Sequence, residues 1–226
     1  MKKLLIMISV LLSTLEAKED IKTLQYSGVD TTYNGVEMLV KREKHKKCYK
    51  VPVAPETIFG GEFAAKDVPK ECQRSFVISL GVVQLMKLDD EIETVGELEV
   101  LHFMEKLDFD PEHYIIVDAR GEAWYKKLTI PHSVNIPKKD ILFDKDFPEE
   151  FDKNLKLLNI TKDKNGTLDF SKAKEAIVFC NGSWCTQSAK AIKALVALGY
   201  PKKKLYWYRG GMQDWVGLGF SAVSGK

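Results

Sequence analysis

Short apolar runs separated by helical patterns dominate the second half of the chain. Apolar residues recur at helical spacing over about residues 94–104, 141–160 and 185–198. Four short, mostly apolar runs fit strands buried in a sheet: residues 114–117, 133–137, 176–179 and 205–208. Strands that alternate with helices favour the α/β class, in which a parallel sheet carries helices on both faces.

The first helical stretch carries a start signal. Thr94 and Glu97 have the spacing of a capping box, in which two residues satisfy each other's backbone amides. Leu98, Leu101 and Met104 then fall on one helix face. We therefore expect a helix that begins near residue 94 and packs this face against the sheet.

A weak similarity to a calcium-binding loop begins at Thr161. The last ligand position of such a loop holds a carboxylate, but here it is occupied by Lys172. A turn around Asn165 and Gly166 is the better interpretation.

The N-terminus has the pattern of a secretory signal. Lys2 and Lys3 precede an apolar stretch over residues 4–12, and residues 15–17 are similar to a cleavage site. The stretch is short for a membrane span, so an uncleaved anchor ranks second. We expect residues 1–17 to be removed and the protein to be periplasmic or secreted.

Residues 18–75 resist assignment because glycines and prolines break them into short pieces. We treat them as an irregular N-terminal extension of unknown fold, followed by an α/β domain over residues 76–226. The chain of 226 residues has 34 basic and 32 acidic side chains, for a formal net charge of +2. Nothing in that balance suggests nucleic acid as a partner. The basic run at residues 41–47 is interpreted first as a solvated loop or strand end.

Export changes how the cysteines are interpreted. Cys48 and Cys72 lie in the extension, and a structural disulfide between them is the first choice in an oxidising compartment. Two unpaired thiols, or one of them paired with Cys180, remain as alternatives. The spacing lacks a CxxC motif or a histidine pair, so it does not suit a metal site.

Cys180 is the strongest candidate for chemistry. It ends the apolar run 176–179, and a polar loop over residues 181–184 leads directly into the last helical stretch. Loop amides and the positive end of that helix would point at the sulfur and stabilise a thiolate, the nucleophilic form of cysteine. In parallel sheets reactive sites lie beyond the carboxyl ends of the strands. Three other polar residues occupy such ends: Asp118, Arg120 and Arg209.

Several of these motifs, in this order, resemble the rhodanese-like sulfurtransferase family. The matching stretches are VDAR at residues 117–120, LTIPHSVNIP at 128–137, VFC at 178–180, LGY at 198–200 and YRGGMQDW at 208–215. The resemblance covers about residues 90–222, and with the signal sequence it is similar to exported bacterial members. It implies a rhodanese-like parallel sheet flanked by helices.

The resemblance also implies a reaction and its residues. In this family the cysteine takes a sulfane sulfur from a donor, becomes a persulfide and passes the sulfur to a nucleophile. That role falls to Cys180 here, with a polysulfide, persulfide or thiosulfate as donor and a thiol as acceptor. No metal or organic cofactor is implied. Backbone amides of the loop would hold the outer sulfur, and the residues concerned are Asn181, Gly182, Ser183, Trp184 and Cys185.

The loop departs from the commonest family pattern. Many members carry a cation about five positions after the cysteine, where this chain has Cys185, and residues 181–189 contain no Arg or Lys. The departure weakens the case for thiosulfate as donor. Arg209 or Arg120 could supply the charge from a strand end, although Arg120 equally fits a structural salt bridge. Cysteine phosphatases need an arginine where this chain has Thr186, so phosphatase chemistry is disfavoured.

Cys185 and Trp184 each have two interpretations. Cys185 either resolves the Cys180 persulfide as a redox partner or serves as a small apolar residue at the helix start. Trp184 either lines the donor pocket or packs against the sheet edge. Two alternative functions are open: a thiol-disulfide redox protein that uses Cys180 and Cys185, or a non-catalytic binding module. In the second case, residues 18–75 would dock a protein partner.

Overall fold

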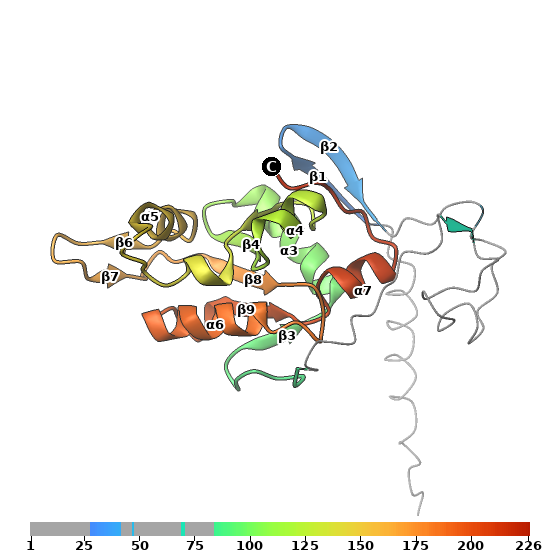
Figure 1. Ribbon diagram of the computed structural model, residues 1–226. Coiled ribbons are helices and arrows are strands. Elements are labelled where there is room, and N and C mark those ends of the chain that lie inside the picture. Colours follow the sequence, from blue (N-terminus) through green and yellow to red (C-terminus); the bar gives the residue numbers. More distant parts are fainter. Residues whose placement is uncertain (1–27, 42–46, 48–68, 71–83) are drawn as a thin grey trace, which may run out of the picture.

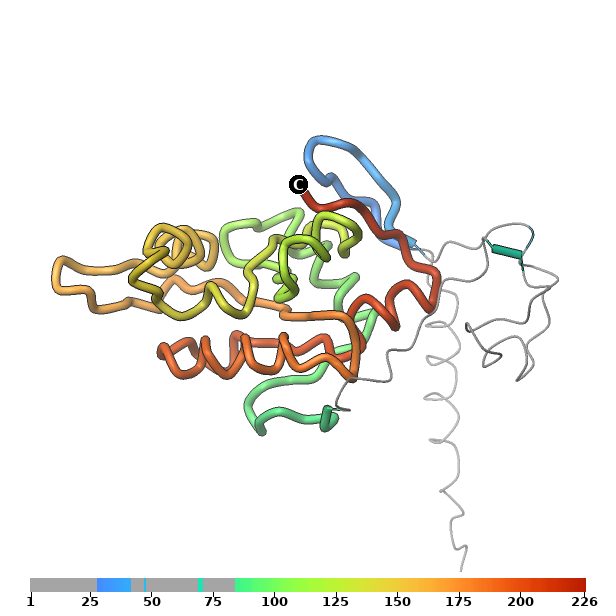
Figure 2. The backbone as a smooth tube through the Cα atoms, viewed as in Figure 1, coloured from blue at the N-terminus to red at the C-terminus, as the bar shows by residue number. Residues whose placement is uncertain are grey.

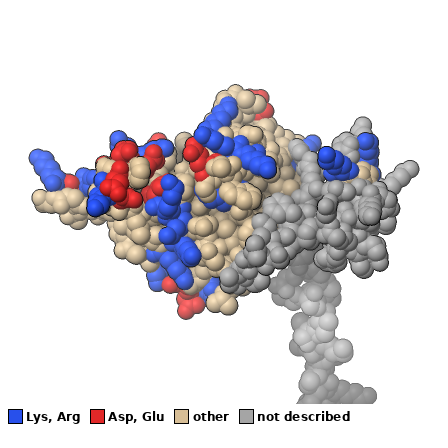
Figure 3. Space-filling model, in the orientation of Figure 1, with Lys and Arg blue, Asp and Glu red and all other residues tan. Residues whose placement is uncertain are grey.

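The computed structural model describes residues 28–41, 47, 69–70 and 84–226 (Figure 1). The expected signal segment lies outside these residues, as do Cys48 and Cys72, so the signal and the disulfide stay predictions. No helix in the described part of the chain is both long and apolar enough to cross a bilayer. On the face shown in Figure 3, basic and acidic side chains are interspersed.

A five-stranded parallel sheet forms the centre of the domain. Its strands, in spatial order, are β3 (Glu93–Val95), β9 (Leu205–Tyr208), β8 (Glu175–Phe179), β4 (Tyr114–Asp118) and β5 (Ser133–Asn135). The four predicted strands are confirmed. The sequence analysis did not predict β3, which has only three residues. This strand lies at one edge of the sheet and pairs only with β9. The central strand is β8, which leads directly to Cys180.

Helices cover both faces of this sheet (Figures 1 and 2). Side chains alternate along a strand, so Ile115 and Val117 of β4 enter one core while Ile116 enters the other. The first core holds apolar side chains of α5 and α6, and the second holds those of α3 and α7. The helices are α3 (Glu97–Phe109), α4 (Glu122–Lys127), α5 (Pro148–Leu157), α6 (Gln187–Leu198) and α7 (Gly211–Gly217), with 3₁₀ turns at Lys138–Asp140 and Lys202–Lys204.

Two predicted helix starts were wrong. Helix α3 is capped by Gly96, whose amide donates to the Glu99 carboxylate at 2.9 Å, whereas Thr94 belongs to β3. Helix α5 begins only at Pro148, although helical spacing had suggested a start near residue 141. The residue before a proline is disfavoured in helical geometry, which explains why the helix does not extend further back. Both helices are therefore present; α3 starts later and runs on to Phe109, and α5 is shorter than expected.

The expected turn at Asn165 and Gly166 is present. It joins the short strands β6 (Thr161–Lys162) and β7 (Leu168–Asp169). The Asp163 carboxylate accepts hydrogen bonds from the amides of Asn165 and Thr167, both at 2.8 Å. That carboxylate therefore closes the turn.

A β-hairpin occupies the described part of the extension. Strands β1 (Val29–Tyr33) and β2 (Val36–Val40) are antiparallel and are joined by Asn34 and Gly35, both with positive φ. An Asn-Gly pair between strands is a strong hairpin signal, and the sequence analysis missed it. Val29 and Val40 are buried in the same core as α3 and α7. The hairpin lies beside the C-terminal segment (Figure 1), where the Ser221 amide donates to the Lys41 carbonyl at 2.7 Å.

Candidate active site

Cys180 lies at the carboxyl end of the central strand β8, and its side chain is 1% exposed. The start of α7 packs directly against its backbone. The Met212 amide donates to the Cys180 carbonyl at 3.0 Å, and Gly211 has φ +57. A Cβ at Gly211 would stand 2.2 Å from the Cys180 carbonyl oxygen. Only glycine fits this close approach, so Gly211 is explained by the packing of α7 on the cysteine loop.

A short chain of hydrogen bonds orients the Cys180 thiol. The indole N–H of Trp207 donates to the Ser188 hydroxyl at 3.0 Å, and this hydroxyl donates to the Cys180 sulfur at 3.2 Å. Because an indole N–H can only donate, the Ser188 hydroxyl oxygen accepts from Trp207. The hydroxyl proton of Ser188 is then directed to the Cys180 sulfur. Ser188 was not among the predicted site residues. Its spacing from Ile192 and Leu195 places it on the buried face of α6. A polar residue on an otherwise apolar helix face could have been recognised in the sequence as a candidate site residue.

Cys185 lies beside Cys180, and its side chain is 7% exposed. Both residues are free thiols in this structure. The Cys180 sulfur donates to the Cys185 carbonyl oxygen at 3.2 Å. The loop therefore folds back so that residues five positions apart bring their sulfurs together.

The two thiols differ in acidity. Burial raises the pKa of Cys180 well above its usual value, and the hydrogen bond with Cys185 raises it further. For Cys185, the hydrogen bond from Cys180 lowers the pKa to about 6, and the amides of Gln187 and Asn181 contribute. Sequence reasoning placed the amide-stabilised thiolate on Cys180, but the structure places it on Cys185. The largest causes are the burial of Cys180 and the interaction of Cys185 with the Cys180 side chain.

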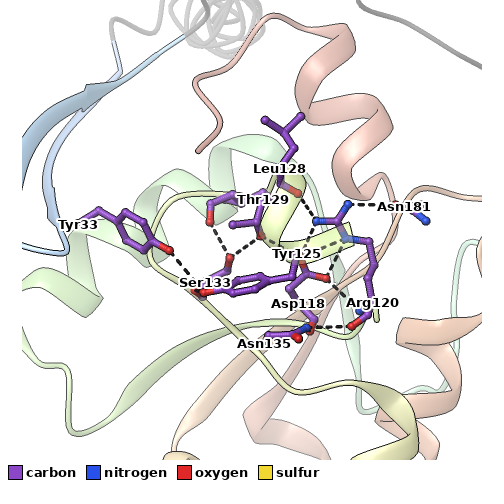
Figure 4. A network of polar contacts seen from close by, with 10 residues as sticks. Tyr33, Asp118, Arg120, Tyr125, Leu128, Thr129, Ser133, Asn135 and Asn181 are labelled. Atoms are coloured by element: carbon purple, nitrogen blue, oxygen red, sulfur yellow. Dashed lines mark hydrogen bonds and ion pairs between the residues drawn. The ribbon is translucent and has the colours of Figure 1, made fainter. Parts of the chain in front are cut away.

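A buried ion pair supports the other side of the loop (Figure 4). Arg120 donates through Nε to Asp118 Oδ1 at 2.9 Å and through Nη2 to Asp118 Oδ2 at 2.6 Å. Its Nη1 donates to the Asn181 side-chain oxygen at 3.1 Å, and Nη2 also contacts the Leu128 carbonyl. Of the two interpretations left open for Arg120, the structure supports the salt bridge, which here also anchors Asn181.

The same polar network extends to β5 and to the hairpin. Thr129 donates to Asp118 Oδ2 at 2.8 Å, and the Asn135 amide donates to the Asp118 carbonyl at 3.0 Å. Tyr125 donates to the Ser133 carbonyl at 3.1 Å and lies 3.5 Å from the hydroxyl of Tyr33. No buried side-chain polar atom of the described residues lacks a partner. Networks satisfied to this degree hold their members in one arrangement, so the loop rests on a rigid base.

Arg209 has a different place from the one expected. It comes directly after β9 and donates through Nε and Nη2 to the Gln84 carbonyl, at 3.2 and 2.8 Å. The Gln84 amide in turn donates to the Ser183 carbonyl at 2.7 Å. The guanidinium thus fixes the chain segment that runs beside the cysteine loop. This contact joins residues far apart in sequence, so no local sequence pattern predicted it.

The tip of the loop packs tightly against α7. The half-buried Trp184 donates from its indole N–H to the Gln213 side-chain oxygen. A Cβ at Gly182 would lie 3.1 Å from both Trp184 and Gln213, so glycine lets the indole cross the loop. The Cys185 amide donates to the Gly182 carbonyl at 2.9 Å and closes the turn. The indole of Trp184 is therefore bonded to α7, a contact that neither interpretation had named.

The predicted loop residues surround Cys180, while the two arginines are committed to other partners. Within the described residues, no group of three or more His, Cys, Asp or Glu side chains could hold a metal ion. The site therefore offers two adjacent sulfurs, one hydroxyl donor and a set of backbone amides. Such groups suit nucleophilic sulfur chemistry.

Comparison with known proteins identifies the domain. A family model described as the Rhodanese-like domain matches residues 100–218, which is more than half of the chain. No curated protein matches the chain.

Solved structures with a related fold include proteins from three organisms. A protein of Bacillus halodurans is 20% identical over 58% of this chain and 77% of its own, with a TM-score of 0.42. A thiosulfate sulfurtransferase from Pseudomonas aeruginosa is 19% identical over 60% of this chain, with a TM-score of 0.40, and the match spans 21% of that protein. An uncharacterized protein from Saccharomyces cerevisiae is 28% identical over 55% of this chain and 91% of its own, with a TM-score of 0.39.

Proposed function

The chain belongs to the rhodanese-like domain family, and from this premise we propose that it is a sulfurtransferase that carries sulfane sulfur as a persulfide on Cys180. One observation carries the proposal. The Cys180 sulfur lies at the carboxyl end of the central strand, accepts a hydrogen bond from the Ser188 hydroxyl and lies 3.2 Å from the Cys185 carbonyl oxygen. A cysteine held in place by a hydrogen-bond donor at the end of a strand is an arrangement that suits covalent catalysis.

The loading step can be written with all atoms balanced. Cys180 gives up its proton to solvent, and the Cys180 thiolate attacks the outer sulfur of a persulfide R–S–SH. The bond between that sulfur and R–S breaks, and R–S⁻ leaves with the electron pair. The products are Cys180–S–SH and R–S⁻, which takes up the released proton and becomes R–SH. A thiol acceptor then removes the sulfane sulfur from Cys180 by attacking it in the same way.

The charges near the loop favour some donors over others. Arg120 is neutralised by Asp118, and Arg209 is bound to the Gln84 carbonyl. Among the described residues, neither guanidinium is placed to bind a dianion at Cys180. We therefore expect polysulfides and organic persulfides to be better donors than thiosulfate. In this proposal Arg209 positions the segment beside the loop.

The cellular setting forms part of the proposal. The signal pattern at residues 1–17 supports export to the periplasm or outside the cell, where a Cys48–Cys72 disulfide would be stable. A protein partner that docks on residues 18–75 would then supply or receive sulfur. Mass analysis of the protein exported by its own host, under non-reducing conditions, tests cleavage and the disulfide together.

A dithiol-disulfide redox function is the second candidate, and the hydrogen bond between Cys180 and Cys185 favours it. It differs from sulfur transfer in needing both cysteines. Sulfur transfer to cyanide needs only Cys180.

The test is transfer of sulfur to cyanide from polysulfide or thiosulfate, measured as thiocyanate. The protein should work faster with polysulfide, and Cys180→Ser should abolish the activity with both donors. The matched control removes the other two cysteines together, as Cys48→Ser with Cys72→Ser, and should keep the activity. Thiocyanate formation that survives Cys180→Ser would refute the proposal. Activity that is absent in the unchanged protein, with disulfide exchange present, would favour the redox candidate.

A further inference from the structure

The second thiol of the loop is not consumed by the transfer reaction proposed above. The Cys180 sulfur lies 3.2 Å from the carbonyl oxygen of Cys185, and the amides of Asn181 and Gln187 favour the Cys185 thiolate. We propose that Cys185 attacks the persulfide on Cys180 and expels sulfide, so that the protein reduces sulfane sulfur and does not only move it. This inference rests on the proposed persulfide at Cys180.

Burial favours this internal reaction over attack by an outside thiol. The Cys180 side chain is 1% exposed, and its sulfur is enclosed by Ser188 and Cys185. An external thiol would have to enter this space, whereas the Cys185 sulfur is already there. Groups held in contact react as if present at very high concentration, because the entropy of bringing them together has been lost on folding. The nearest nucleophile for a Cys180 persulfide is therefore Cys185.

The surroundings also suit Cys185 to act as a thiolate. Two amides point at its sulfur, and the positive charge of Arg120 lies near enough to favour the anion. These contacts accompany a lowering of the Cys185 pKa to about 6, so the anion dominates at neutral pH. Ser188 is aimed at the other sulfur and stabilises negative charge on Cys180. The loop thus stabilises charge on each sulfur.

The sulfide-releasing step conserves atoms and electrons. After loading, Cys185 is present as a thiolate at neutral pH, because its pKa is lowered to about 6. This thiolate attacks the inner sulfur of Cys180–S–SH and forms the Cys180–Cys185 disulfide. The bond to the outer sulfur breaks, and that sulfur leaves with the electron pair as HS⁻. Cys185 is oxidised, and the sulfane sulfur is reduced to sulfide.

A thiol reductant completes the cycle. Two molecules of a low-molecular-weight thiol, or one dithiol protein, reduce the Cys180–Cys185 disulfide and are themselves oxidised to a disulfide. The incoming thiolate would meet Cys185 first, because its side chain is the more exposed of the two. The net reaction converts one sulfane sulfur and two thiols into sulfide and one disulfide.

The test is a single turnover without added thiol, under anaerobic conditions. The reduced full chain is mixed with one equivalent of an organic persulfide, and free sulfide and protein mass are measured. The unchanged protein should release sulfide and lose the mass of two hydrogen atoms, with a Cys180–Cys185 disulfide found by peptide mapping. Cys185→Ser should release no sulfide and gain the mass of one sulfur atom. Cys185→Ala provides a second variant in case one of them folds poorly.

The outcomes separate this inference from the function on which it rests. If both the unchanged protein and the Cys185 variants keep the extra sulfur and release no sulfide, resolution by Cys185 is wrong, but sulfur transfer stands. If neither Cys185 variant gains a sulfur atom although both are folded, the persulfide on Cys180 is itself refuted. Sulfide release that persists in both Cys185 variants would also overturn the inference, since another thiol would then be responsible.

Discussion

At the scale of single residues, two thiols of the same chemical type are given opposite properties by their contacts. Cys180 is the deeper of the two, and burial raises its pKa, whereas amides and the Cys180 hydrogen bond lower that of Cys185. Desolvation disfavours a charged sulfur, and donated hydrogen bonds favour it. The burial of Cys180 and its interaction with Cys185 therefore decide which cysteine is the thiolate at rest.

The Cys185 thiolate should be visible in its pH dependence. In the unchanged protein, the alkylation rate of Cys185 by a small reagent should rise with a midpoint near the pKa of about 6, while Cys180 stays unreactive at that pH. Removing the donated hydrogen bond raises the Cys185 pKa, so Cys180→Ala should move the midpoint to higher pH. Site-specific mass spectrometry across a pH series measures both. An unchanged midpoint in Cys180→Ala would argue against the hydrogen bond as the main cause.

Ser188 should act on the reactivity of Cys180. Its hydroxyl lowers the pKa of that thiol, so Ser188→Ala should shift the pH profile of persulfide formation upward and slow loading at neutral pH by about tenfold, as expected for a lost hydrogen bond to a charged group. Ser171→Ala, in an exposed turn, is the matched control and should leave loading unchanged. Equal profiles for the two variants would remove Ser188 from the mechanism.

At the scale of elements, the site is assembled from the segments that come directly after the central strands. Cys180 follows strand β8, and the Asp118–Arg120 pair lies at the end of β4. The start of α7 packs against the cysteine loop. The contact with α7 depends on Gly211, because any side chain there would collide with the Cys180 carbonyl. The geometry of the loop is thus set by a neighbouring helix as well as by its own sequence.

Two glycines of α7 provide a matched pair of variants. Gly211→Ala would force a Cβ to 2.2 Å from the Cys180 carbonyl at a positive φ, whereas a Cβ at Gly217 meets nothing within 4 Å. We expect Gly211→Ala to displace the loop, to reduce sulfur loading strongly and to destabilise the fold by about 1–3 kcal/mol. Gly217→Ala should be close to neutral. Loading rate and urea unfolding measure these effects, and similar behaviour of the two variants would contradict the packing argument.

Local patterns predicted much of this arrangement. Apolar runs marked four strands and the position of Cys180, because strands buried on both faces leave a clear signal. Strand β3 was not predicted, because its three residues are too few to show an apolar pattern. The hydrogen bonds from Arg209 to the Gln84 carbonyl were not predicted, because they join segments distant in sequence. The division of charge between the two thiols depends on the direction of individual amides, which sequence does not encode in a readable way.

At the scale of the whole molecule, the N-terminal hairpin belongs to the fold of the domain. Val29 and Val40 fill the core beneath α3 and α7, and His132 of the domain pairs with Asp108 and contacts Thr31 of β1. Deleting residues 18–75 would therefore strip apolar side chains from a core. A loss of partner binding on such a deletion would not by itself locate a docking surface. Surface substitutions are the better probe of that alternative.

Matched valines in β2 test whether the hairpin contributes to stability. Val40 is 0% exposed and Val36 is 61% exposed. Val40→Ala should lower the free energy of unfolding by about 2 kcal/mol, because it removes buried methyl groups and leaves a cavity, whereas Val36→Ala should have little effect. Urea unfolding followed by circular dichroism compares them. Equal stability of the two variants would mean that the hairpin is not part of the cooperative unit.

The central claim is that Cys180 carries the persulfide. The most direct measurement is the intact mass of Cys185→Ser and of Cys180→Ser after brief exposure to polysulfide under non-reducing conditions. The account predicts that Cys185→Ser gains one sulfur atom, that cyanide removes it, and that Cys180→Ser gains none. A cyanide-sensitive sulfur on Cys180→Ser, or none on a folded Cys185→Ser, would contradict the account.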